Sequence, residues 1–139
     1  MPANTTPIFI TQGNFTIGRI AAANTGSDGS GTLVTIVTAG TNGTRVDGVR
    51  FRNAQATAAA SSAMVHRIFL TDTAGANPRL IGEVATATAT RSTTAIGAAS
   101  IYTFDQPIIM KSGQIMSVCQ SVYGSAADQF DACGFAGDY

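Results

Sequence analysis

Short apolar segments with a period of two, separated by turn-forming residues, constrain the fold of this chain more than any other feature. The segments are rich in β-branched residues and end at Gly, Asn, Asp or Pro, and helical periodicity is nearly absent. In the run Val49-Arg50-Phe51-Arg52 the apolar and basic side chains must point to opposite faces of a strand. The pattern therefore predicts an all-β protein, a single-domain antiparallel β-sandwich or jelly-roll-like barrel of about eight strands.

The strands and the core can be placed from this alternation. Strands are expected at 7–10, 15–20, 32–38, 45–52, 64–71, 79–86, 101–110, 114–123 and 129–135. The expected core consists of Val34, Ile36, Val49, Phe51, Ile68, Leu70, Val84, Phe104, Ile115, Val118 and Phe130. The Ala-rich segment 54–63 can form a short helix by propensity, but we expect extended or loop structure there.

Three connections between these strands contain residues that favour tight turns. Asn42-Gly43 is the strongest short hairpin signal, because both residues tolerate positive φ. Gly113 is expected to take the left-handed position of a second turn. Residues 123–128 form the third turn, which would join the last two expected strands as a hairpin.

The length of 139 residues suits one domain, 1–139, whose first residues, 1–11, form a candidate extended arm. Two prolines in this segment disfavour helix and hold the chain extended. The apolar trio Ile8, Phe9 and Ile10 could then add as a strand to the open sheet edge of a neighbouring subunit. Alternatively, the same trio belongs to the first strand of the chain's own sandwich.

The charge content excludes several classes of partner. Charged residues make up 12% of the chain, about half the usual fraction, and eight basic residues balance eight acidic ones. Neutrality argues against nucleic acid as a partner, because binding to phosphates needs a basic excess. No apolar run is long enough for a membrane span and residues 1–6 do not resemble a signal peptide, so we expect a cytoplasmic product without a membrane partner. Low charge also favours a subunit that is permanently packed into an assembly.

No catalytic or metal-binding motif is recognisable, so we expect a protein that is not an enzyme and uses no cofactor or metal. His66, the only histidine, is either a general base or metal ligand or, as we expect, a strand-face side chain hydrogen-bonded to a neighbour. Cys119 and Cys133 are expected to be free thiols, since a disulfide needs a different strand register from the one expected. Asp128 and Asp131 could be recognised as a glycosidase pair only in three dimensions.

Arginine dominates the basic residues, and three arginines fall on one expected strand. One interpretation is a solvated strand face. The other, which we favour, is a permanent interface, because the planar guanidinium pairs bidentately with carboxylates. The candidate interface residues are therefore Ile8, Phe9, Ile10, Arg45, Arg50 and Arg52.

Several segments resemble small structural proteins of tailed bacteriophages, specifically the capsid decoration (cement) proteins. They are 1–9 (MPANTTPIF), 22–32 (AANTGSDGSGT), 34–47 (VTIVTAGTNGTRVD) and 137–139 (GDY). The resemblance implies a compact β-domain bound non-covalently to the outside of a major-capsid-protein lattice, often at three-fold positions. It therefore implies a virion protein that is assembled in the host cytoplasm, with the major capsid protein and other copies of itself, as a homotrimer, for partners.

A second function class stays open: a carbohydrate- or receptor-binding β-sandwich, such as a fibre tip or a lectin-like module. In that case Tyr102, Tyr123 or Tyr139, exposed near carboxylates, would stack on sugars. The absence of tryptophan weakens this alternative.

Overall fold

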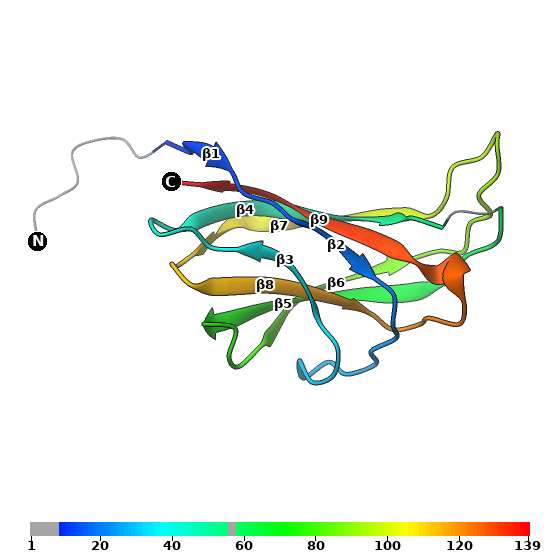
Figure 1. Ribbon diagram of the computed structural model, residues 1–139, viewed down its shortest axis with the longest axis horizontal. Coiled ribbons are helices and arrows are strands. Elements are labelled where there is room, and N and C mark those ends of the chain that lie inside the picture. The colour runs from blue at the N-terminus through cyan, green and yellow to red at the C-terminus, as the bar shows by residue number, and fades with distance from the viewer. Residues whose placement is uncertain (1–8, 56–57) are drawn as a thin grey trace, which may run out of the picture.

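The computed structural model describes residues 9–55 and 58–139, which form two antiparallel sheets packed face to face (Figure 1). The elements are β1 (Gln12–Gly13), β2 (Ile17–Ile20), β3 (Val34–Thr38), β4 (Thr44–Asn53), β5 (Met64–Thr73), β6 (Arg79–Thr86), β7 (Ala99–Met110), β8 (Gln114–Gln120), the 3-10 turn η1 (Ala126–Asp128) and β9 (Phe130–Asp138). The prediction of an all-β antiparallel sandwich is confirmed. Within the described ranges, no helix has the length and apolar character needed to cross a membrane.

The strands pair in a nested order. Sheet A has the order β1-β9-β4-β7, and β2 also pairs with β9, while sheet B has the order β3-β8-β5-β6. The antiparallel pairs therefore include β2 with β9, β3 with β8, β4 with β7 and β5 with β6. Pairing the strands from the two ends of the chain inward in this way is the strand order of a jelly roll.

Eight of the expected strands occur, from 15–20 (β2) to 129–135 (β9), with ends that shift by a few residues. The expected strand 7–10 is not supported where it can be examined: residues 7 and 8 lie outside the described residues, and residues 9 and 10 belong to no strand. The two-residue strand β1 was not expected, because it is too short to carry an alternation.

Two turn glycines were predicted correctly, although Asn42 does not take a positive φ, and the expected hairpins were wrong. Gly43 and Gly113 have the expected positive φ, 97° and 81°. However, the turns join β3 to β4, β7 to β8 and β8 to β9, and each of these connections crosses from one sheet to the other. Among the described residues, only β5 and β6 are successive strands that pair with each other. The φ of a turn residue is local, whereas the partner of a strand depends on which apolar face it must cover.

The expected core is largely correct. Ile115 is the exception: it lies half-buried outside the main cluster, where β8 begins beside the turn at Gly75. Of the other expected residues, three are partly buried against the cluster, namely Val34, Leu70 and Val84. The remaining seven are buried within it: Ile36, Val49, Phe51, Ile68, Phe104, Val118 and Phe130.

Glycines on the inner side of sheet A allow the two sheets to approach closely at β3. A Cβ on Gly134 would lie 2.6 Å from Cγ2 of Val37, and a Cβ on Gly18 would lie 2.5 Å from Cγ1 of Val34. Both distances are shorter than real Cβ contacts. A larger residue at either position would therefore push β3 away from β2 and β9.

His66 lies between aromatic rings in the core. Its ring stacks on Phe51 with centroids 4.3 Å apart and meets Phe130 at 4.7 Å. Neither ring nitrogen has a hydrogen-bond partner among the described residues, so the expected hydrogen bond to a neighbour is wrong. Burial lowers the pKa of His66 from 6.5 to about 4, and the ring is neutral at neutral pH.

Removing a buried ring is expected to cost much of the stability. Phe51→Ala and Phe104→Ala should each lower the free energy of unfolding by about 3–5 kcal/mol, because each leaves a cavity in the core. Phe15→Ala is the control: this ring is exposed, so the change should stay within about 0.5 kcal/mol. Urea unfolding measures all three variants. Unchanged midpoints for the two core variants would contradict the strand faces.

Stability is expected to fall in mild acid because of His66. Its pKa is lowered in the folded state, so between pH 6.5 and 4 the unfolded chain binds a proton that the folded chain does not. The free energy of unfolding should therefore fall as the pH drops through this window, by roughly 3 kcal/mol in total. His66→Phe keeps an aromatic ring and removes the histidine titration, so its stability should fall much less over the window, with only the onset of the loss from aspartates of lowered pKa, such as Asp128 and Asp138, near pH 4. Parallel profiles for the two proteins would contradict this origin.

Candidate interaction surface

The outer face of sheet A, turned away from sheet B, carries both apolar side chains and arginines. β4 produces this arrangement by alternation, since Val49 and Phe51 are buried while Arg50 and Arg52 are exposed. The strand register extends the pattern across the sheet. One cross-strand row contains Ile17, Cys133, Arg50 and Ile101, and the next contains Arg19, Asp131, Arg52 and Ala99.

Most of the exposed large apolar side chains of the described ranges lie on this face. Ile17 is 62% exposed and Ile101 is 57% exposed. Six of the nine large apolar side chains that are exposed within the described ranges lie on this face: Ile10, Phe15, Ile17, Ile101, Ile109 and Phe135. Four of these six, Ile10, Phe15, Ile17 and Phe135, line an open groove of about 450 Å³, which we call the apolar groove. Clustered exposed apolar side chains are typical of interaction sites.

Asp138 holds the beginning of the described chain against this face. Its backbone carbonyl accepts a hydrogen bond of 2.8 Å from the N–H of Thr11, and its carboxylate accepts one of 2.6 Å from Nδ2 of Asn14. The hydroxyl of Thr44 donates to the same carboxylate. Burial alone would raise the pKa of Asp138, but hydrogen bonds from Thr44, Asn14 and Gly40 lower it below its usual value. The ionised carboxylate thus fixes the segment that lines one side of the apolar groove.

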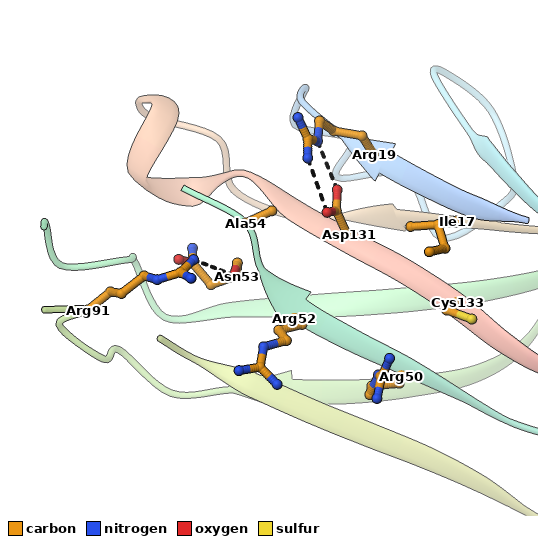
Figure 2. Close-up of a pocket in the computed structure, with 9 residues that line it drawn as sticks. All are labelled: Ile17, Arg19, Arg50, Arg52, Asn53, Ala54, Arg91, Asp131 and Cys133. Carbon is orange, nitrogen blue, oxygen red and sulfur yellow. Dashed lines mark hydrogen bonds and ion pairs between the residues drawn. The ribbon is translucent and has the colours of Figure 1, made fainter. Parts of the chain in front are cut away.

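A second groove, of about 360 Å³, adjoins the apolar groove at Ile17, Arg50 and Cys133. Figure 2 shows its arginines, which come from β2, β4 and the loop before β7. We call it the arginine cleft, and its charged lining consists of Arg19, Arg50, Arg52, Arg91 and Asp131. Four guanidinium groups therefore face a single carboxylate.

The four arginines differ in what they already bind. Arg19 forms two hydrogen bonds with the carboxylate of Asp131, at 2.8 and 3.1 Å, and this pairing raises the pKa of the guanidinium. Arg91 donates to backbone carbonyls of residues 53 and 55 at 3.3 and 3.1 Å. The ion pairs among the described residues include neither Arg50 nor Arg52. These two arginines are available to an external anion.

Both cysteines are free thiols, as expected. Cys119 and Cys133 do not lie on a hairpin, because β8 and β9 belong to opposite sheets. Burial raises the pKa of Cys133, although the charge of Arg50 opposes the shift, and burial likewise raises the pKa of Cys119. Neither thiol has the lowered pKa of a nucleophilic cysteine.

The six interface residues predicted from the sequence do not all lie together in the structure. Ile8 lies outside the described residues, while Phe9 and Ile10 are exposed just before β1. Arg45 is paired with Asp47 at 2.8 Å. The remaining two, Arg50 and Arg52, lie in the arginine cleft.

Sequence reasoning missed two arginines of the cleft, Arg19 and Arg91. Arg19 was recognisable as an outward residue from the alternation of Phe15, Ile17 and Arg19. Its position beside β4 depends on β9 pairing with both β2 and β4, which no local signal reveals. Arg91 belongs to a loop without periodicity and carried no signal at all.

The other candidate residues do not assemble into a reactive site. Asp128 is buried and accepts hydrogen bonds from the N–H groups of Ser62 and Gly124, at 2.6 and 2.8 Å, whereas Asp131 lies in the arginine cleft. The two carboxylates therefore do not form a glycosidase pair. In the described part of the chain, no group of three or more His, Cys, Asp and Glu residues could hold a metal ion.

Comparisons of the chain with protein-family models, with curated proteins and with solved structures find no match.

Proposed function

We propose that this chain is a structural virion protein that decorates the outside of a phage capsid and stabilises it by binding non-covalently to the major capsid protein lattice. The observation that carries the proposal is the outer face of sheet A, where an apolar groove and the arginine cleft lie side by side. Permanent interfaces combine apolar contacts with arginines in this way. The segments that resemble decoration proteins are the reason for proposing a phage capsid as the assembly to which this face binds.

Such a protein would act by binding to the outside of the shell in many copies. Each copy would bury the outer face of sheet A against the shell, and many modest contacts would add through avidity. We further propose a homotrimer, since local three-fold positions of a capsid lattice favour matching symmetry. In this proposal the protein is not an enzyme, has no nucleic-acid or membrane partner, and is located on the capsid exterior after assembly in the host cytoplasm.

The alternative, a carbohydrate- or receptor-binding module, receives less support. Jelly rolls occur in both capsid and lectin domains, so the strand order does not discriminate between the two classes. Sugar stacking needs an accessible aromatic face, but Tyr102, Tyr123 and Tyr139 are all half-buried. Tyr102 also packs edge-on against Phe104, with ring centroids 5.2 Å apart.

Polar substitutions in the apolar groove should abolish binding to the shell. Ile17→Ser with Phe135→Ser removes two exposed apolar side chains and should cost little stability. Purified protein is added to empty shells assembled without it, and the bound fraction is measured by cosedimentation. We expect wild type to sediment with the shells and the double variant to stay in solution.

Leu80→Ser is the matched control, because Leu80 is an exposed apolar residue of β6 in the opposite sheet. It should sediment like wild type. Failure of wild type to bind shells, together with binding to a glycan array, would replace the proposal with the carbohydrate-binding alternative.

Deleting residues 2–10 tests the candidate arm. The described sandwich begins its hydrogen bonds at Thr11, so the truncated protein should still fold. It should lose shell binding or fall from trimer to monomer, because it lacks two exposed apolar residues, Phe9 and Ile10, as well as the preceding segment. Circular dichroism and light scattering after size exclusion measure the two effects. Unfolding of the truncated protein would show that the segment is part of the core instead.

A further inference from the structure

The arginine cleft has a charge that its own surroundings do not balance. Its four guanidinium groups face only the carboxylate of Asp131, which Arg19 already binds with two hydrogen bonds. Each guanidinium has five N–H donors. Arg50 and Arg52 take part in none of the ion pairs among the described residues, so their donors are free for an external acceptor. An anion in the cleft would also relieve the repulsion between these neighbouring positive charges.

The spacing of the free arginines matches an extended peptide. Arg50 and Arg52 are two residues apart on β4 and point to the same face, which places their Cα atoms about 7 Å apart. Acidic side chains at alternate positions of an extended segment have the same repeat. The apolar groove continues from the cleft at Ile17 and Cys133, where it offers contacts to apolar residues of the same segment.

The surroundings favour a carboxylate over a nucleic-acid phosphate. The cleft already holds one carboxylate bidentately, that of Asp131, in the geometry that suits arginine. The other residues in the cross-strand row of Arg50 carry no charge: Cys133 and Ile101 pair with it on either side, and Ile17 follows beyond Cys133. The chain as a whole is neutral, so beyond the cleft it offers a long polyanion no net attraction. A short acidic segment needs only the local charge, within the screening length of about 8 Å at physiological salt.

We propose that the arginine cleft binds an extended acidic segment of a protein partner, with two carboxylates at alternate positions bound by Arg50 and Arg52 and an apolar side chain two residues further along, on the same face of the segment, seated toward the apolar groove. The inference rests on the proposed function, because it names the partner chemistry that the same face would recognise on the shell. Arg91 lines the far side of the cleft, where its bonds to backbone carbonyls hold it in place.

The test uses a blocked hexapeptide, Ser-Glu-Ser-Glu-Ser-Val, whose two Glu residues and Val share one face when extended, and its matched control with Gln in place of both Glu residues. Each peptide is titrated into the full-length protein, and the arginine Nε–Hε signals are followed by NMR. The Glu peptide should shift the signals of Arg50 and Arg52, and its affinity should fall with added salt. The Gln peptide should bind at least about tenfold more weakly, since it lacks the charge-assisted hydrogen bonds.

Variants locate the site and control for folding. Arg50→Glu with Arg52→Glu should weaken the Glu peptide at least about tenfold. Arg50→Lys with Arg52→Lys keeps the charge but loses the bidentate fork, and should weaken it less. The matched control is Arg79→Glu, on β6 of the opposite sheet, which should bind like wild type. Melting curves confirm that each variant is folded.

Two results of the binding titrations would overturn the inference. One is a Glu peptide that leaves the Arg50 and Arg52 signals unmoved or that binds the charge-reversed variant equally well. The other is tighter binding of inorganic phosphate or a single-stranded oligonucleotide at the same arginines.

Shell cosedimentation separates this inference from the proposed function. If Arg50→Glu with Arg52→Glu still sediments while Ile17→Ser with Phe135→Ser does not, the acidic-segment inference fails and the capsid function stands. Peptide binding without sedimentation of wild type would keep the carboxylate site and overturn the capsid function.

Discussion

The alternation of β4 connects the core of this protein to its candidate interaction surface. Phe51 points inward and stacks on His66 of the opposite sheet, with ring centroids 4.3 Å apart, while Arg50 and Arg52 on either side of it point outward. A shift of register by one residue would expose the ring and bury two unpaired charges, so it is strongly disfavoured. The packing of a single aromatic ring thereby determines the direction of the two arginines.

β9 assembles the rest of the surface, because it lies between β2 and β4 in sheet A. Gly134 on its inner face lets β3 approach, and Asp138 at its end holds Asn14. On its outer face, Asp131 binds Arg19 and thereby orients one wall of the arginine cleft. The proposed docking face thus rests on backbone pairing between strands from opposite ends of the chain, and a rigid scaffold of this kind suits a permanent interface.

Structural features that depend on local physics were predicted correctly from the sequence. The period of two is a property of neighbouring residues, so the inward residues Val49 and Phe51 and the outward Arg50 and Arg52 were all placed correctly. The positive φ of Gly43 was likewise predicted, because it depends only on the absence of a Cβ. Hairpins were wrongly expected at the turns, since turn residues do not encode whether the next strand continues the same sheet or crosses to the other.

The candidate site likewise has a part that could be predicted from the sequence and a part that depends on the tertiary structure. The sequence by itself determined that the chain is an antiparallel β-sandwich or barrel and that arginines lie on the outer side of β4. Only the tertiary structure decided that Arg19 and Arg91 join them, that Ile17 and Phe135 flank them, and that His66 is buried without a hydrogen bond. The reason is that the direction of a side chain depends on the alternation between adjacent residues of one strand. Which residues lie next to each other depends instead on which distant strands pair, and that pairing is determined by the burial of the whole core.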